Sequence, residues 1–170
     1  MRDRLQTELF RATALTFESF AFVFPSSEVG DEEQAAAFEA AVEVEFRGAF
    51  GGRLVLAVWG DVLAGMVANM LGTAGEEPGP SRPAEMRLDA LGEMANVICG
   101  NLLTAIGGSK EVFLLSAPRG RGAKEIGGPA VAGGKERLAA AIQVGLDGGR
   151  AEVFLYADAE IPSKAGESRS

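Results

Sequence analysis

The residues whose types and spacing could do chemistry lie together on one expected helix, residues 84–106. At about 100° of rotation per residue, four positions of this segment fall within about 60° of one another: Asp89, Glu93, Asn96 and Gly100. Glu93 and Asn96 are one helical turn apart, so a carboxylate and a carboxamide point outward together. The chemistry available to such a face is the docking of another molecule through a charged group and an amide group.

The opposite face of the same segment predicts how the helix packs. Apolar residues recur there at three- and four-residue steps and define the expected core stripe: Leu88, Leu91, Ala95, Ile98, Leu102 and Ile106. Beside the polar face, Gly92 and Gly100 leave the surface low, so that a partner protein could approach the backbone. Each glycine inside a helix costs roughly 1 kcal/mol relative to alanine, which suggests a packing or docking reason for both. On the pattern alone, the solvated face of an amphipathic helix is the favoured interpretation, and a docking site is the alternative.

The composition excludes several classes of chemistry. The 170 residues include no histidine, which removes Ser-His-Asp and Cys-His catalysis and histidine-ligated metals. The one cysteine, Cys99, lies among apolar neighbours and is expected to be a buried small residue rather than a nucleophile. The net charge of −8 argues against nucleic acid or an anionic membrane as the main partner. The chain also lacks a signal-type N-terminus and an apolar run of about 18 residues, so a cytoplasmic location is expected.

Other elements must position the polar helix, and the periodicity of the chain predicts them. Apolar residues at helical spacing predict helices over residues 2–22 and 63–71, the second one capped by Asp61. Alternating or continuous apolar runs predict strands, which cover residues 42–47, 53–59, 111–117, 138–146 and 150–157. Residues 31–41 are left unassigned. The order of helix, two strands, two helices and three strands predicts an α+β fold, with long helices packed on one face of an antiparallel sheet.

The chain length is that of about one domain, which we place at residues 1–157. Residues 158–170 are polar and are expected to form a disordered tail. Residues 119–136 are a glycine-rich excursion whose role stays open. Three of its residues form a small basic cluster: Arg119, Arg121 and Lys124. That cluster is a weak signal for nucleic acid and is typical of a surface loop, one that could meet an acidic partner.

The polar helix carries a specific resemblance. Asp89, Glu93 and Asn96, followed by VICGNLL, resemble the signature of the CheC/CheX family of chemotaxis phosphatases: Asp or Ser, three residues, Glu, two residues, Asn, and a proline about twenty residues on. Pro118 follows the intervening strand about one residue closer than in the usual pattern. Upstream, the run VEFRGAFGGRLVLAVWGDVLAGMVANMLG resembles the paired strands and following helix of the family. The resemblance spans about residues 9–156.

The number of signature helices distinguishes the branches of this family. CheC-like members carry two such helices in pseudo-symmetric halves. Here the first helix offers Glu18-Ser-Phe-Ala21, with alanine where the asparagine would stand. The resemblance therefore implies one competent site and is closer to CheX, whose members are homodimers.

The resemblance also implies a substrate and a role for each residue. The substrate would be a phosphorylated CheY-like response regulator, which itself supplies Mg²⁺ and a lysine, so no cofactor is expected on this chain. Asn96 would hold a water in line with the phosphorus, and Glu93 would pair with the regulator's lysine. Asp89, Gly92 and Gly100 would assist docking. Orienting a water in this way needs no strong base, because phosphoryl transfer passes through a loose transition state.

The sequence thus favours a CheX-like phosphatase that acts on a response regulator in chemotaxis or a related two-component pathway. The alternative is a non-catalytic interaction module, in which the same helix binds a receiver domain or a signalling partner without hydrolysis. A structural protein with an unused helix face is the third interpretation. The sequence does not specify which regulator or which motility pathway is served.

Overall fold

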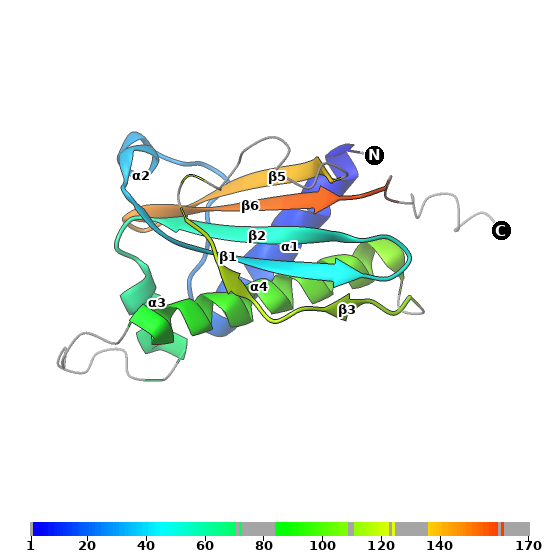
Figure 1. Ribbon diagram of the computed structural model, residues 1–170. Coiled ribbons are helices and arrows are strands. Elements are labelled where there is room, and N and C mark those ends of the chain that lie inside the picture. The colour runs from blue at the N-terminus through cyan, green and yellow to red at the C-terminus, as the bar shows by residue number, and fades with distance from the viewer. Residues whose placement is uncertain are drawn as a thin grey trace.

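Two antiparallel hairpins form the centre of the fold, which a computed structural model describes for residues 2–70, 72, 84–108, 111–122, 124, 136–159 and 161. Their strands pair in the order β1, β2, β6, β5, and two short strands lie along the outer edge of β1. The bounds are β1 (Phe38–Arg47), β2 (Gly52–Trp59), β3 (Leu114–Leu115), β4 (Arg119–Gly120), β5 (Arg137–Leu146) and β6 (Gly149–Ala157). All of these pairs are antiparallel, as the sequence predicts (Figure 1).

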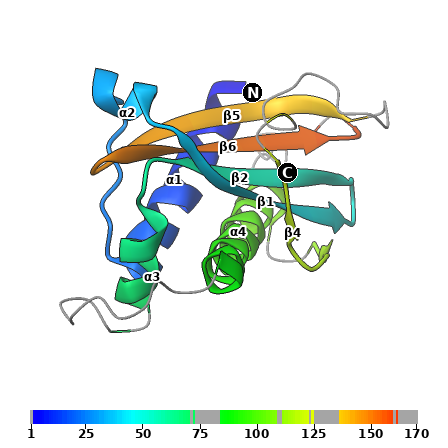
Figure 2. The same cartoon turned by 60° about the vertical axis from the view of Figure 1, so that its left-hand side comes forward.

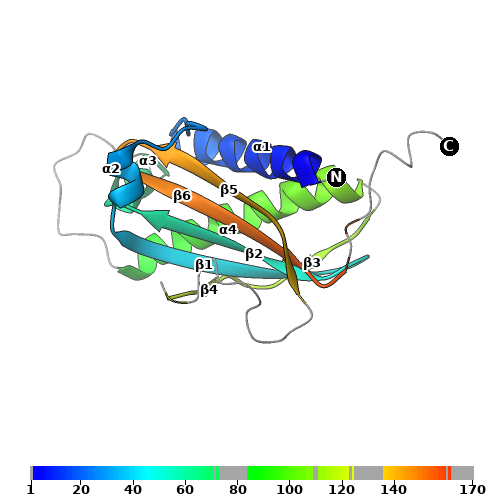
Figure 3. The same ribbon diagram turned by 90° about the horizontal axis from the view of Figure 1, so that it is seen from above.

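Helices cover one face of this sheet (Figures 2 and 3). The described chain contains α1 (Arg2–Ala21), α2 (Asp31–Ala35), α3 (Leu63–Met70) and α4 (Ala84–Gly107). The long α1 and α4 pack on each other, with α4 against β1 and β2 and α1 against β5. The short α2 lies beside the end of β6 instead. The α+β architecture with long helices on one sheet face is therefore confirmed.

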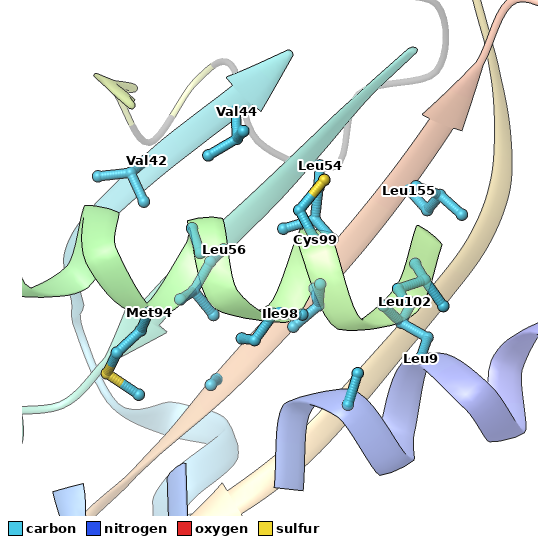
Figure 4. Packing of buried hydrophobic residues seen from close by; sticks show 14 of the residues in the cluster. Leu9, Val42, Val44, Leu54, Leu56, Met94, Ile98, Cys99, Leu102 and Leu155 are labelled. Atoms are coloured by element: carbon cyan, nitrogen blue, oxygen red, sulfur yellow. The ribbon is translucent and has the colours of Figure 1, made fainter. Parts of the chain in front are cut away.

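The core lies between α1, α4 and the inner face of the sheet (Figure 4). From α4, Met94, Ile98 and Leu102 point toward the sheet, where they meet alternate residues of the central strands, such as Leu54 and Leu56. This two-residue alternation explains why β1 and β2 present one apolar row to the helices. The same packing accounts for the apolar character of Glu85–Gly107, a stretch long and apolar enough to cross a membrane: half of it is buried inside the fold, as expected for a core helix.

The thiol of Cys99 lies inside this core. The residue is fully buried among the apolar side chains of α4 and the sheet. Burial raises the pKa of the Cys99 thiol to about 12, so the thiolate is essentially absent at neutral pH. The expectation that Cys99 is a packing residue and not a nucleophile is confirmed.

On the face of the sheet opposite the long helices, one buried carboxylate accepts hydrogen bonds from three arginines. Glu43 of β1 is 0% exposed. Its Oε1 accepts a hydrogen bond of 3.0 Å from Arg53 of β2, and its Oε2 accepts bonds from Arg119, at 2.8 Å, and from Arg121. The guanidinium of Arg53 also lies 4.0 Å above the ring of Tyr156. Arg119 and Arg121, two members of the small basic cluster in the sequence, are therefore both paired with Glu43.

This carboxylate holds β4 against β1, and backbone bonds reinforce the attachment. Ser116 N–H donates to the Glu45 carbonyl at 2.9 Å, and Arg121 N–H donates to the Ala41 carbonyl at 2.9 Å. Pro118 lies between these two attachments and has no N–H to offer to the ladder. The strand expected over residues 111–117 is consequently reduced to Leu114–Leu115, and pairing resumes only at Arg119–Gly120.

Two further local expectations are corrected. The carboxylate that meets the start of α3 is Glu39 and not Asp61, since Glu39 Oε1 accepts hydrogen bonds from the N–H groups of Val62 and Leu63 at 3.0 and 3.1 Å. The packed chain also continues past residue 157. Asp158 exchanges hydrogen bonds with Gly51, and Ile161 is buried in the main core. The rest of the expected tail lies outside the described residues, as does most of the excursion at 119–136.

Removing the charge of Glu43 should lower the stability of the protein much more than removing the charge of its exposed neighbour Glu45. Glu43→Gln removes the carboxylate that the buried Arg53 shares with Arg121 and Arg119. Arg53 keeps its pair with Glu136 and Arg119 keeps its pair with Glu45, so we expect the free energy of unfolding to fall by about 3 kcal/mol. Within the described chain Glu45 pairs with Arg119 alone, and both side chains are largely exposed, so Glu45→Gln should cost less than about 1 kcal/mol. Urea unfolding of both variants measures the difference. Equal losses would contradict the role of Glu43 in holding β4 against β1.

The same carboxylate should make stability depend on pH. Burial by itself would raise the pKa of Glu43, but hydrogen bonds and charge from Arg121, Arg119 and Arg53 hold it below the ordinary value of 4.5. A lowered pKa stabilises the folded state above pH 4.5, and this contribution is lost as the pH falls below that value. The wild-type chain should therefore lose more stability between neutral and acid pH than Glu43→Gln does.

Candidate active site

The polar face of α4 borders a groove of about 480 Å³ between this helix and the edge of the sheet. From the helix, Asp89, Glu93 and Asn96 line the groove, and from the sheet side Pro118 and the segment next to it do so. Asp89 and Glu93 are exposed, whereas Asn96 is half-buried. The structure thus brings the three signature residues and the signature proline into one hollow.

The carboxamide of Asn96 is held by none of the hydrogen bonds in the described chain. Its Oδ1 is buried and has no donor there. A buried acceptor without a partner costs about 1–3 kcal/mol. The terminal torsion of asparagine is broad, so the amide can turn without breaking a hydrogen bond. Asn96 is therefore a group at the groove wall that gains a hydrogen bond when its oxygen meets a donor from outside.

Glu93 lies on the same face of α4 but in a different environment. Its carboxylate is exposed, and within the described part of the chain it has no ion-pair partner, like that of Asp89 one turn earlier. Arg119 and Arg121, which adjoin Pro118 and Gly120 in the groove's other wall, are bound to Glu43 instead. Asp89 and Glu93 thus form an acidic ridge that is available to a cation from another molecule.

Gly92 proves to be a packing residue. A Cβ added there would lie 2.8 Å from Cβ of Pro118 and 3.0 Å from its Cγ, closer than real side chains approach. The space that was expected to admit a partner protein is thus filled by Pro118 of the same chain. Gly100 differs, because a Cβ there would meet nothing within 4 Å, so only Gly100 keeps the open surface that the sequence predicts.

Two further details of the helix differ from the sequence prediction. Leu88, expected in the core stripe, is 37% exposed and lines the groove beside Asp89. Asn96, expected to face outward, is partly covered. The cover over Asn96 arises because residues 118–120 run along β1 and flank α4, so the groove wall lies where the helix alone would meet solvent (Figure 2). Val42 and Gly120, which also line the groove, carry no recognisable sequence signal because strand pairing alone brings them there.

The corresponding stretch of α1 does not form a second acid–amide pair. Ala21, which stands where an asparagine would be needed, is fully buried. Its carbonyl accepts a hydrogen bond of 2.7 Å from Nδ2 of Asn69 in α3, so this end of α1 is tied to a neighbouring helix. Among the described residues, no group of three or more Cys, Asp or Glu side chains is placed to hold a metal ion.

Solved structures with the same architecture are chemotaxis proteins. CheX from Vibrio vulnificus superimposes with a TM-score of 0.63 at 16% identity, covering 91% of this chain and 97% of that one. CheX from Desulfovibrio desulfuricans gives 0.63 at 18% identity, over 91% and 99%. CheX in a complex of CheX, CheY, BeF₃ and Mg²⁺ from Borrelia burgdorferi gives 0.61 at 16% identity, over 90% and 97%. The fold is thus that of the CheC-like and CheX-like chemotaxis proteins.

The sequence itself assigns the family. Residues 40–124 match the family described as chemotaxis phosphatase CheX, a span that includes most of β1 and all of β2, α3, α4, β3 and β4. This chain belongs to the CheX family. No curated protein matches it significantly.

Alanine substitutions at the two glycines of α4 should have opposite effects on stability. In Gly100→Ala the new methyl group meets open space, so the helix gains about 1 kcal/mol from its higher propensity. In Gly92→Ala the methyl group overlaps Pro118, and we expect a net loss of about 1–3 kcal/mol from overpacking. Thermal unfolding of both variants tests the contact. If both variants raised Tm equally, Pro118 would not be seated on Gly92.

Proposed function

We propose that this chain hydrolyses the aspartyl phosphate of a CheY-like receiver domain, with Asn96 orienting the attacking water and Glu93 docking the receiver. Membership of the CheX family supports the activity class, and the complex of a similarly folded CheX with CheY supports the choice of partner. The observation that carries the proposal is the Asn96 carboxamide, which lines the groove and forms no hydrogen bond within the described chain.

The reaction needs positioning more than it needs acid or base. The oxygen of a water attacks phosphorus, the bond between phosphorus and the aspartyl oxygen breaks, and its electron pair stays on the carboxylate. Inorganic phosphate leaves, and the water's proton passes to solvent. A loose transition state demands little from a base, so an amide that accepts a hydrogen bond from the water and aims its lone pair can supply much of the effect. This assignment agrees with a chain that has no histidine.

Docking is the role proposed for the acidic ridge. Glu93 pairs with a lysine of the receiver, and Asp89 adds negative charge one helical turn away. The receiver also carries the Mg²⁺. An exposed carboxylate that forms no ion pair within the described chain gives none up there when it pairs with that lysine. Gly100 leaves the backbone open farther along α4. The homodimer and the cytoplasmic location stay predictions.

Removing the amide should abolish turnover and leave binding intact. We expect Asn96→Ala to slow the decay of a phosphorylated receiver by on the order of 100-fold relative to wild type, because the water loses its orientation. Asn101→Ala is the matched control, since Asn101 is an exposed asparagine of the same helix that does not line the groove. The measurement is loss of the phosphoryl label in the presence of Mg²⁺, with CheY-type receivers of the same cell screened in parallel.

Two outcomes of this assay would contradict the assignment. Full activity of Asn96→Ala would place the chemistry elsewhere. If no receiver decayed faster with the wild-type chain although one bound to it, the protein would be a non-catalytic interaction module.

Reversing the charge on the ridge should weaken binding. In Glu93→Lys the receiver's lysine would meet a like charge, and we expect Kd to rise about tenfold or more, equivalent to at least about 1.4 kcal/mol. Glu18→Lys is the control, because Glu18 belongs to the incomplete motif of α1 and should leave both affinity and turnover unchanged. Titration of each variant with a beryllofluoride-activated receiver gives Kd, and equal affinities for Glu93→Lys and wild type would refute the docking role.

A further inference from the structure

A second groove, of about 510 Å³, lies on the other side of the acidic ridge. It is bounded by α1, α3 and α4, and its apolar lining comes from Phe20, Phe22, Val67, Met70 and Met86. Asp89 and Glu93 line this groove as well as the active-site groove. A molecule seated at Asn96 and Glu93 would therefore border the apolar groove directly.

Phe22 is the unusual residue of this groove. It follows the last residue of α1 with φ of 54°, and no other non-glycine residue of the described chain has positive φ. Glycine is the residue that this conformation favours, because a Cβ is strained there. The side chain of Phe22 is also 66% exposed. In the isolated chain, both the backbone and the side chain of this residue are thus in unfavourable states, a combination that points to a contact made with another molecule.

The strained turn is fixed firmly in place. Val23 N–H donates to the Phe17 carbonyl at 3.1 Å, and Asn69 Nδ2 donates to the Ala21 carbonyl at 2.7 Å. These two bonds hold the residues on either side of Phe22 to α1 and α3. The aromatic ring is therefore presented from a defined position at the rim of the groove and does not depend on a loose loop.

We propose that this groove, with Phe22 as its anchor, binds an apolar surface of the same receiver domain whose aspartyl phosphate faces Asn96. The inference rests on the proposed function and extends it to a second contact area. Aromatic anchors carry much of the energy of protein interfaces. The methionines Met70 and Met86 give the groove walls that can adapt to an apolar partner.

Charge favours a receiver over a second copy of this chain as the occupant. Among the described residues that line the groove there are two carboxylates, those of Asp89 and Glu93, and no cationic side chain. Two copies that met through this patch around a two-fold axis would place like charges together. A receiver that brings a lysine to Glu93 would neutralise the ridge while its apolar surface covers Phe22.

Phe22→Gly is the variant that tests the groove. Glycine relieves the positive φ, so we expect Tm to rise by about 2–4 °C, while Kd for a receiver activated with beryllium trifluoride and Mg²⁺ rises about tenfold or more. A variant that is more stable and yet binds less tightly is not explained by damage to the fold. Turnover at saturating receiver should stay at the wild-type rate, because Asn96 is untouched. Phe24→Ala is the matched control, since Phe24 is 76% exposed and does not line the groove.

The results separate this inference from the proposed function. Wild-type affinity of Phe22→Gly together with normal turnover would overturn the groove and leave the phosphatase intact. Weakened binding by Phe22→Gly, with no turnover by the wild-type chain, would support the groove and refute the phosphatase. If Phe22→Gly instead changed the mass measured by light scattering and left receiver affinity unchanged, the groove would join two copies and the proposal would be wrong.

Discussion

The buried carboxylate of Glu43 is the constraint on which the candidate site depends. It binds Arg119 and Arg121 across the edge of β1 and so fixes the segment that follows Pro118, while the bond from Ser116 N–H to the Glu45 carbonyl fixes the segment before it. Pro118 then lies on Gly92 of α4 and closes one wall of the groove that contains Asn96. A buried ion cluster of this kind contributes less to net stability than its attraction suggests, because the charges lose their hydration. Its consequence here is geometric, since it sets how the sheet edge meets the helix.

The groove that Pro118 closes on one side is suited to chemistry that depends on orienting the reacting groups. Among the described residues it offers one carboxamide without a hydrogen bond and three carboxylates without an ion-pair partner, those of Glu85, Asp89 and Glu93, and these residues form no metal cluster. The reacting charge, the metal and the phosphoryl group would all arrive on the partner. This chain must therefore supply a rigid helix face flanked by small residues. The packing of α4 on α1 and the sheet holds that face in place.

Local pattern was enough to predict α1, α3 and α4, the hairpins and the face that carries Glu93 and Asn96, whereas the short α2 lies in a stretch that the pattern leaves unassigned. Most of the features that it missed depend on contacts between residues far apart in the sequence. The bonds from Arg119 and Arg121 to Glu43 join positions 76 and 78 residues apart. The seat of Pro118 on Gly92, and with it the partial burial of Asn96, follows from that pairing. The strain at Phe22 is invisible to periodicity because it lies in the backbone of a turn.

The decisive experiment is a crystal structure of this chain with a receiver activated by beryllium trifluoride and Mg²⁺. We expect the groove between α4 and Pro118 to face the beryllium trifluoride, with Oδ1 of Asn96 turned outward and hydrogen-bonded to a water in line with the aspartyl bond. A receiver bound at another face of the molecule, or an Asn96 that keeps Oδ1 buried and away from any such water, would contradict this expectation.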